Sequence, residues 1–188
     1  NVWAVSLTSF FMDVSSEMVI NILPLFLANV LGVKTSLIGV IEGVAEATAS
    51  LLKLFSGWLS DKLGSRKWIA VAGYGISAIS KPFFLLTNTW ASIAGARWAD
   101  RIGKGVRTAP RDALVADSID PKNRGLAFGF QRAADTAGAM LGLLIAILVV
   151  WLVQKSAQTL NLNTFRTVVW ISLIPAVLAV LSIAIGTK

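Results

Sequence analysis

The stretch "GWLSDKLGSRK", Gly57–Lys67, is a short polar link between two long apolar segments. Residues 35–60 precede its charged part, and residues 68–87 follow it. A helix rises about 1.5 Å per residue, so each segment is long enough to cross the hydrocarbon layer of a membrane, which is about 30 Å thick. The link therefore indicates a membrane surface, where one helix ends and the next begins.

The composition agrees with a membrane protein. Of the 188 residues, 55% are hydrophobic and 14% are charged, against about 25% charged in an average soluble domain. In a chain this apolar, the net charge of +7 favours basic loops at a membrane surface over a nucleic-acid partner. The absence of Cys and His excludes disulfides, imidazole catalysis and the usual zinc sites. We expect one domain, residues 1–188, with no metal and no cofactor.

Six apolar segments are predicted to be transmembrane helices, because helices and closed barrels alone satisfy their backbone in lipid. A barrel requires short segments of alternating polarity, and these are absent from the sequence. The chain begins at Asn1 rather than at Met, so we expect residues upstream of it. The predicted spans are residues 2–29, 35–60, 68–87, 90–117, 125–153 and 167–186.

Basic residues in the links predict the orientation, because cytoplasmic loops are enriched in Lys and Arg. With both termini in the cytoplasm, the inner side holds Lys62, Arg66, Lys67, Lys122, Arg124 and Lys188. The outer side then holds Lys34, Lys155 and Arg166. We expect an integral protein of a bacterial cytoplasmic membrane, with the lipid bilayer as its first partner.

Many charged residues lie inside the predicted spans, where each costs roughly 2.5–3.5 kcal/mol at the centre of the membrane. A dozen unpaired ions would cost about 30–40 kcal/mol, which exceeds a net stability of roughly 5–15 kcal/mol. These groups must therefore pair with one another or line water. They are Asp13, Glu17, Glu42, Glu46, Lys53, Lys81, Asp100, Arg101, Lys104, Arg107, Arg132 and Asp135.

Helical spacing places the charges of each span on one face. The basic residues of "RWADRIGKGVRTAPRD", residues 97–112, fall within one 120° sector of the fourth span. A purely structural network is the alternative interpretation, but buried ion pairs stabilise a fold less than apolar packing does. Rows of small residues predict close helix packing: Gly39, Gly43 and Ala47; Gly125, Gly129 and Ala133; and Gly138 with Gly142.

An internal similarity relates the second and fifth spans. "GVIEGVAEATASLL", residues 39–52, resembles "GFQRAADTAGAMLGLL", which starts at Gly129. Both segments place paired charges three or four residues apart in a helix rich in Gly and Ala. A repeat of three helices plus three helices predicts this correspondence.

The link after the second span resembles the loop signature of the major facilitator superfamily, G-x-L-[AS]-D-[RK]-x-G-[RK]-[RK]. The matching residues are Gly57, Leu59, Ser60, Asp61, Lys62, Gly64 and Arg66. In "RIGKG", Arg101 and Gly105 are similar to the family's R-x-x-x-G element. The resemblance implies an all-α polytopic membrane protein whose six helices form two three-helix inverted repeats. These six helices would be the N-terminal half of a twelve-span transporter.

The loop itself predicts a cluster of charges. Asp61 lies near the C-terminal end of the second span, where the helix dipole disfavours an acid by roughly 0.3–1 kcal/mol, and Asp117 has the same disadvantage at the end of the fourth. We expect both acids to have partners, with Arg66 and Lys67 between them. In the family, this cluster latches the two halves of the transporter while the outside is open. An ordinary polar loop that sets topology is the alternative.

The predicted function is secondary active transport of a small solute by alternating access, driven by protons. Asp13, Glu17, Glu42 and Glu46 are the candidate proton carriers. Their candidate partners, or the ligands of an anionic substrate, are Arg101, Lys104, Arg107 and Arg132. The predicted cavity comprises these residues together with Asp100 and Asp135. Acids and bases nearly balance, which leaves the charge of the substrate open.

The missing partner is predicted to be a second six-helix half, either the C-terminal part of the same protein or a second copy. We favour a truncated chain. Two other classes of function remain: a non-transporting scaffold or channel subunit, and a membrane-embedded enzyme that uses carboxylates and a divalent metal. The ordered D-G-x-x-A-R…G-x-x-x-D-x-x-x-D pattern of phosphatidyl-alcohol transferases is absent from the sequence.

Overall fold

The computed structural model describes residues 1–86, 89–154 and 159–187, and the described part is helical without strands. The all-α prediction is therefore confirmed. Lys155, Lys188 and the end of the third predicted span, at residue 87, lie outside the described residues. The elements are α1 (Val2–Ile20), α2 (Leu23–Asn29), α3 (Thr35–Leu63), α4 (Arg66–Leu86), α5 (Trp90–Asp117), η1 (Pro121–Asn123), α6 (Arg124–Gln154) and α7 (Leu162–Gly186).

The first predicted span, residues 2–29, is not one continuous helix. α1 ends at Ile20, and α2 begins at Leu23 with Pro24 in its first turn. Proline has no backbone N–H to donate and is favoured at the start of a helix, so it begins a new helix here. The Asn21 side chain donates a hydrogen bond of 2.8 Å to the Glu17 carbonyl, which caps the end of α1.

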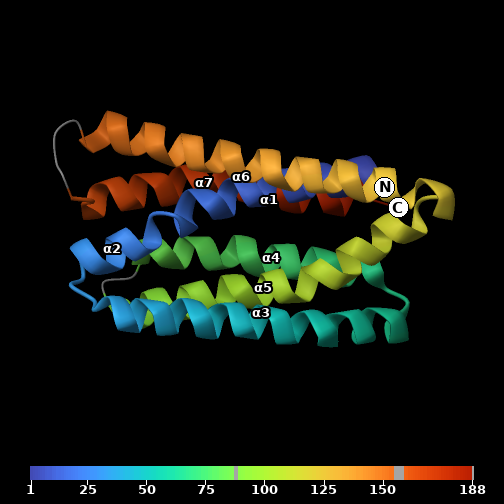
Figure 1. The fold of residues 1–188 in the computed structure, drawn as a ribbon, viewed down its shortest axis with the longest axis horizontal. Helices are drawn as coiled ribbons and strands as arrows, with labels where there is room; N and C mark the ends of the chain where they lie inside the picture. The colour runs from blue at the N-terminus through green and yellow to red at the C-terminus, as the bar shows by residue number, and fades with distance from the viewer. Residues whose placement is uncertain (87–88, 155–158, 188) are drawn as a thin grey trace.

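The six long helices of the described chain form two groups of three that contact each other (Figure 1). α1 packs on α6 and α7, whereas α5 packs on α3 and α4, and α4 and α7 join the groups. If each repeat is three consecutive spans, the first span of each repeat packs on the second and third spans of the other. This exchange gives the two-repeat architecture that the sequence predicted.

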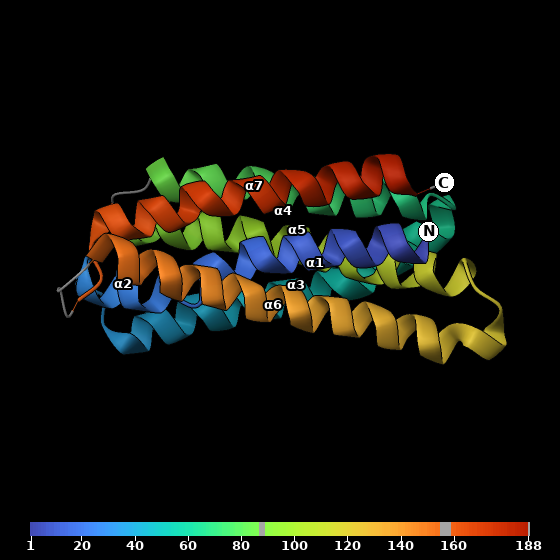
Figure 2. The same ribbon diagram turned by 90° about the horizontal axis from the view of Figure 1, so that it is seen from above.

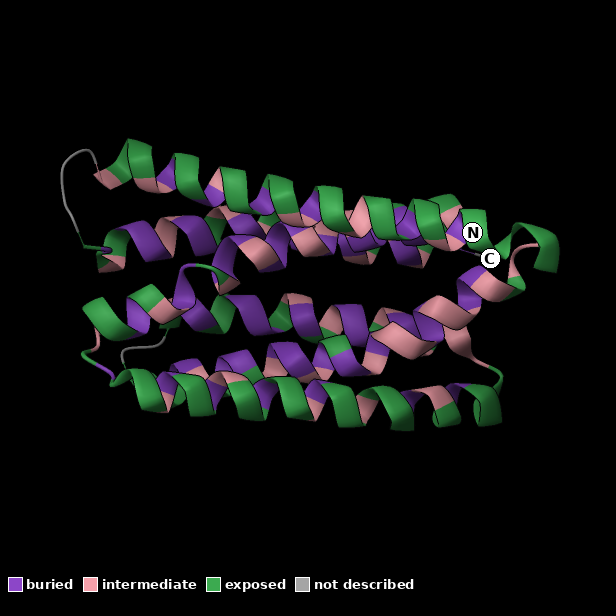
Figure 3. Ribbon diagram, viewed as in Figure 1, coloured by how far each residue is buried: buried purple, intermediate pink, exposed green. Residues whose placement is uncertain are grey.

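One face of the molecule carries the charged spans. Figures 1 and 2 show α3 and α6 flanking α1 and α5 on this face, with α4 and α7 on the opposite side. We call it the α1/α5 face, formed by α1, α3, α5 and α6. Figure 3 shows exposed residues along α3 and α6, which flank this face.

Two glycines of α6 allow it to approach α1 closely, as predicted. A Cβ at Gly138 would lie 2.5 Å from the carbonyl oxygen of Phe10, and one at Gly142 would lie 2.5 Å from that of Val14. Real Cβ atoms do not approach an oxygen so closely, so any larger residue would push the two helices apart. The α1–α6 contact therefore depends on the missing side chains at both positions.

The other predicted rows of small residues do not make close contacts within this chain. A Cβ at Gly39, Gly43, Gly125 or Gly129 would meet no atom within 4 Å. The rows lie on exposed sides of α3 and α6, so they make no close packing within this chain, and close packing against helices beyond it stays a prediction. Close contacts are made instead by other glycines of α4 and α5: Gly73, Gly103 and Gly105.

Four segments within the described residues are long and apolar enough to cross a membrane: Val2–Asn29, Arg66–Leu86, Pro121–Gln154 and Leu162–Gly186. α3 and α5, with 29 and 28 residues, are also long enough but carry the charged stripes. Both termini and the α3–α4 link lie at the same end of the molecule (Figure 1). The protein is thus an integral membrane protein, and the side of the membrane on which each end lies stays a prediction.

Candidate transport site and gating cluster

Two ion pairs join α3 to α5 on the α1/α5 face. Arg97 Nη2 lies 2.5 Å from Glu42 Oε2, and Arg101 Nη1 lies 3.2 Å from Glu46 Oε2. Both acids and both bases are four residues apart, so each pair of side chains lies on one helix face, one turn apart. Arg101 is 4% exposed, whereas the Glu46 side chain is 57% exposed. The arginines are therefore buried between the helices, and Glu46 opens onto the face.

The first of these pairs continues inward to α4 and α1. Arg97 Nη1 lies 3.6 Å from Asp100 Oδ2, and Asp100 Oδ1 lies 3.9 Å from Lys81 Nζ. Lys81 is 1% exposed and donates a hydrogen bond of 3.3 Å to Ser16 on α1. The sequence marked Lys81 as a charge within a span but did not place it in the site. The sequence does contain a signal for its role: Lys81 is a basic residue inside a span that has no acidic residue, so it needs a partner from another helix.

A second charged cluster connects α5 with α1 and α6. Arg111 is buried, donates to Ser9 at 3.0 Å and to Asp112 at 2.9 Å, and lies 3.5 Å from Asp135 Oδ2. Asp135 also lies 3.6 Å from Arg132. The sequence predicted Asp135 and Arg132 as site residues and omitted Arg111, although Arg111 belongs to the same basic stripe. Arg111 is the residue that ties α6 to the two central helices.

Arg107 is placed differently from the other predicted bases. It is buried, its guanidinium lies 4.8 Å from the centre of the Tyr74 ring, and it donates a hydrogen bond to Ser77. Both partners belong to α4, which approaches α5 closely at Gly73 and Gly103. Arg107 therefore packs against α4 rather than lining the α1/α5 face.

Besides Arg107, three predicted cavity residues have no close ionic partner among the described residues. Within the described part of the chain, no base lies within 4.0 Å of the Asp13 or Glu17 carboxylates, and no carboxylate lies within that distance of Lys104. Glu17 accepts a hydrogen bond of 3.0 Å from Asn21. Asp13 interacts electrostatically with Lys104 and Arg111 at longer range. Asp13 and Lys104 thus carry charges on α1 and α5 without an ion pair among the described residues.

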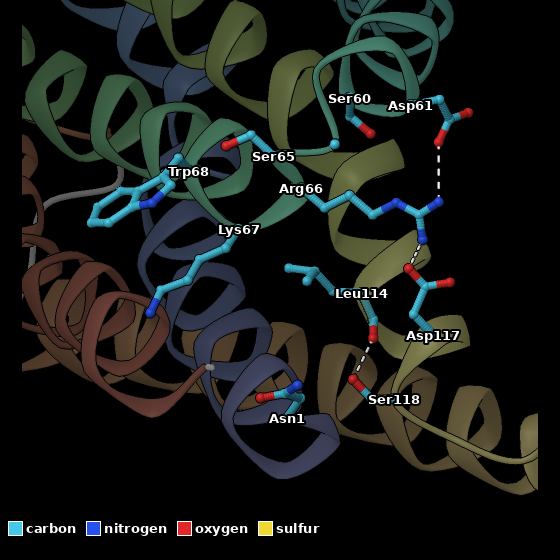
Figure 4. Close-up of a pocket in the computed structure, with 11 residues that line it drawn as sticks. Asn1, Ser60, Asp61, Ser65, Arg66, Lys67, Trp68, Leu114, Asp117 and Ser118 are labelled. Atoms are coloured by element: carbon cyan, nitrogen blue, oxygen red, sulfur yellow. Dashed lines mark hydrogen bonds and ion pairs between the residues drawn. The ribbon is translucent and has the colours of Figure 1, made fainter.

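The predicted charge cluster is present at the end of the molecule that carries both termini. Figure 4 shows Arg66 between Asp61, at 3.2 Å, and Asp117. Gly64 ends α3 with a φ of 60°, a left-handed conformation that favours glycine. A pocket of about 590 Å³ adjoins the cluster. Lys67 was expected between the two acids, but it donates instead to the Thr187 carbonyl after α7.

Pairs of acidic and basic side chains make up these clusters. The described residues contain no group of three His, Cys, Asp or Glu side chains able to hold a metal ion. Six long helical segments of the described chain in two interlocked repeats, four of them apolar enough to cross a membrane, with ion pairs on one face, define an integral membrane domain of the transporter type. The sequence matches the model of the Major Facilitator Superfamily over residues 5–187, and the chain belongs to that superfamily.

Curated relatives agree with this assignment. An uncharacterized MFS-type transporter of Methanocaldococcus jannaschii is 41% identical over 156 residues, covering 83% of this chain and 39% of the relative. An uncharacterized protein of Mycobacterium tuberculosis is 36% identical over 121 residues, covering 60% of this chain and 27% of that protein. Multidrug resistance protein MdtH of Cronobacter sakazakii is 29% identical over 130 residues, covering 66% and 30%. The chain thus spans less than half the length of each of these relatives.

Solved structures show the same fold at low sequence identity. A peptide transporter superposes with a TM-score of 0.82 at 17% identity, covering 97% of this chain and 37% of the transporter. The human organic anion transporter MFSD10 gives a TM-score of 0.73 at 19% identity, covering 97% and 46%. A D-xylose–proton symporter gives 0.63 at 18% identity, covering 98% and 47%. The six-helix arrangement is therefore also the fold of a part of each of these transporters.

Proposed function

We propose that this chain is one six-helix half of a secondary active transporter, which moves a small solute across a cytoplasmic membrane by alternating access, driven by protons. The observation that carries the proposal is the pair of ionic contacts, Glu42–Arg97 and Glu46–Arg101, on the α1/α5 face. A carboxylate as exposed as Glu46 is costly in contact with lipid at this depth. The α1/α5 face therefore meets water, a solute or a second protein body.

The second body is a further six-helix half, either in the rest of the same protein or in a second copy. Two observations support it. The chain spans 39% of the M. jannaschii relative. The exposed rows that contain Gly39 and Gly43 on α3, and Gly125 and Gly129 on α6, flank the face and allow close approach of further helices. A cavity would then lie between the two halves, lined by α1 and α5.

Proton coupling is assigned to Asp13 first. Glu42 and Glu46 are engaged by arginines, so protonation of either one would leave a buried guanidinium without its partner. Asp13 is free of this constraint, since no base of the described residues lies within 4.0 Å of it. It also lies within the electrostatic reach of Lys104, on the opposing helix. Asp13 can therefore change its charge without breaking an ion pair.

The Arg66 cluster is assigned to gating. The Asp61 side chain is 67% exposed although it pairs with Arg66, so it retains surface for a contact with the second half. Asp117 pairs with the same arginine from the end of α5. A rearrangement of these ion pairs would thus move both the α3–α4 link and α5, the helix that carries the basic stripe.

Transport by the full-length protein in proteoliposomes tests the proposal. A screen of small solutes is run with and without an imposed pH gradient, and we expect at least one solute to accumulate only with the gradient. Arg101→Ala should abolish that accumulation, and Ile102→Leu, next to it in the sequence, should retain it. With a scaffold, a channel or an enzyme, the pH gradient would not cause any solute to accumulate.

A further inference from the structure

Lys104 stands apart from the rest of the basic stripe of α5. It is exposed, whereas Arg97, Arg101, Arg107 and Arg111 are buried. It is the fifteenth of the 28 residues of α5, so it lies at mid-helix. None of the carboxylates in the described residues lies within 4.0 Å of its ammonium group. An exposed and unpaired cation at this depth is costly unless the face supplies a partner for it.

Two acids interact electrostatically with this cation, Glu46 of α3 and, more weakly, Asp13 of α1. Glu46 is already paired with Arg101, whereas Asp13 has no ion pair among the described residues and lies too far from Lys104 to form one. The other charged groups around Asp13 are Asp135 from α6 and Arg107 and Arg111 from α5. Of the remaining neighbours of α1, α4 contributes the cation of Lys81, which donates to Ser16 of α1 and lies near Asp100. α2 carries no charge, and the one charged residue of α7, Arg166, lies near its start.

The other basic side chains near Asp13 and Lys104 already form contacts within the chain. Arg101 is held by Glu46, and Arg111 by Asp112 and Asp135. Arg107 is turned towards Tyr74 and Ser77 of α4. An anion that bound to any of these groups would have to displace an existing contact. Lys104 has three donors on a flexible stem and no such contact to lose.

We propose that Lys104 binds an anionic group, a carboxylate or a phosphate, of the transported solute, and that Asp13 controls this contact. Ionised Asp13 competes with the solute for the charge of Lys104. Protonated Asp13 does not compete, so an added proton strengthens anion binding. Linkage is reciprocal, and a bound anion strengthens proton binding by the same factor. The inference rests on the proposed transport function, and it names the solute as an anion that moves together with a proton.

The test measures the electrostatic potential beside Lys104 and does not require transport. Thr108 lies one helical turn beyond Lys104, and its hydroxyl donates to the Lys104 carbonyl at 2.6 Å. A Thr108→Cys variant is made in the full-length protein, with any native cysteines replaced. The rate of modification by a negatively charged sulfonatoethyl methanethiosulfonate is divided by the rate for its positively charged trimethylammonioethyl analogue. This ratio rises where anions are attracted.

The expected size of the effect follows from Coulomb's law. One charge at about 6 Å in a water-like dielectric changes each rate about threefold, and hence the ratio about tenfold, at low ionic strength. Lys104→Gln should lower the ratio by this factor, and Lys104→Arg should preserve it. Asp13→Asn, which mimics the protonated acid, should raise the ratio. Lys122→Gln, the loss of an exposed base beyond α5, should leave it unchanged.

Each outcome decides a separate point. An unchanged ratio in Lys104→Gln overturns the anion contact, because an acid of the second half must then neutralise Lys104. A fall in Lys104→Gln without a rise in Asp13→Asn overturns the control by Asp13 and retains the contact. If both shifts occur but no solute accumulates with a pH gradient, the face binds anions and the transport function itself is wrong. Elution of each variant as a single peak in gel filtration confirms that it is folded.

Discussion

Arg101 shows how a single residue keeps its charge inside the membrane. Its side chain is buried between α3 and α5, and its guanidinium reaches the face where Glu46 is exposed. The buried Nε finds no hydrogen-bond partner among the described residues, and Glu46 supplies the carboxylate that lies within ion-pair distance of the guanidinium. The pair is therefore asymmetric. The buried guanidinium needs the carboxylate to stabilise its charge, whereas the exposed carboxylate is also accessible from the face.

This asymmetry predicts unequal losses of stability. Glu46→Gln leaves a buried cation unpaired and should lower the free energy of unfolding by about 1–3 kcal/mol. Arg101→Gln leaves an exposed carboxylate and should cost less than about 1 kcal/mol. The double variant should be more stable than Glu46→Gln alone and should still fail to transport. Thermal unfolding and uptake measured on the same preparations provide the comparison. Equal losses in the two single variants would contradict the asymmetry.

The gating cluster makes a prediction about rate rather than stability. Asp61→Asn removes an exposed ion pair worth about 0.2–1 kcal/mol and also relieves an unfavourable acid at a helix C-terminus, worth roughly 0.3–1 kcal/mol. These effects nearly cancel, so expression and unfolding temperature should stay close to wild type. Transport should slow on the order of tenfold, because a charged hydrogen bond in a moving interface is lost. Wild-type uptake in Asp61→Asn would mean that the loop only sets topology.

At the residue scale, the sequence predicted the charged groups well and their partners less well. Cost arguments identified which ions must pair, and helix periodicity identified the faces they share. Periodicity cannot say which neighbouring helix a face meets. Arg107 was therefore expected in the cavity, although it packs on α4, and the buried Lys81 was left out of the site.

At the scale of the helices, two features did not follow from the apolar pattern, each for its own reason. The break at Asn21 follows from Pro24 at the start of α2, whereas the openness of the small-residue rows on α3 and α6 depends on which helices lie next to them. An apolar stretch such as residues 2–29 reads as one span because membrane insertion depends on length and polarity. The helical break appears only when Pro24 is recognised as the start of a second helix.

Glycine substitutions distinguish the close α1–α6 contact from an open position on a helix surface. Gly142→Ala places a Cβ 2.5 Å from the Val14 carbonyl oxygen, so α1 and α6 must move apart. We expect a loss of about 1–3 kcal/mol in the free energy of unfolding. Gly95→Ala on α5 meets no atom within 4 Å and should be neutral or slightly stabilising, because alanine favours helices. Thermal unfolding of both variants checks the pair, and similar behaviour would show that α1 and α6 are not in close contact.

At the scale of the whole molecule, the exchange of helices between repeats explains how the site is assembled. α1 and α5 each pack on helices of the other repeat, so both reach the middle of the same face. The charged stripe of α5 and the acids of α1 are thereby opposed. Sequence similarity between the second and fifth spans indicated the repeat, but the packing of the first and fourth spans was not visible in it.

The orientation of the molecule is testable by labelling. Ser65 lies in the α3–α4 link, at the end that carries both termini, and Ser36 lies at the opposite end of α3. Single cysteines at these positions should react with a membrane-impermeant thiol reagent from opposite sides, Ser65→Cys from the cytoplasm. The sequence also indicated Ser156 for this purpose, but that residue lies outside the described part of the structure. Reaction of both positions from the same side would contradict the topology.

The central claim is that this chain belongs to a transporter that couples a solute to protons, and solute-driven proton movement tests it most directly. Full-length protein is reconstituted in vesicles that contain a pH-sensitive dye, without any imposed gradient, and a solute identified by the uptake screen is added outside. The account predicts a change in internal pH in the wild type and in Ile102→Leu, and no change in Asp13→Asn. Solute entry without proton movement in the wild type, or full proton movement in Asp13→Asn, would contradict it.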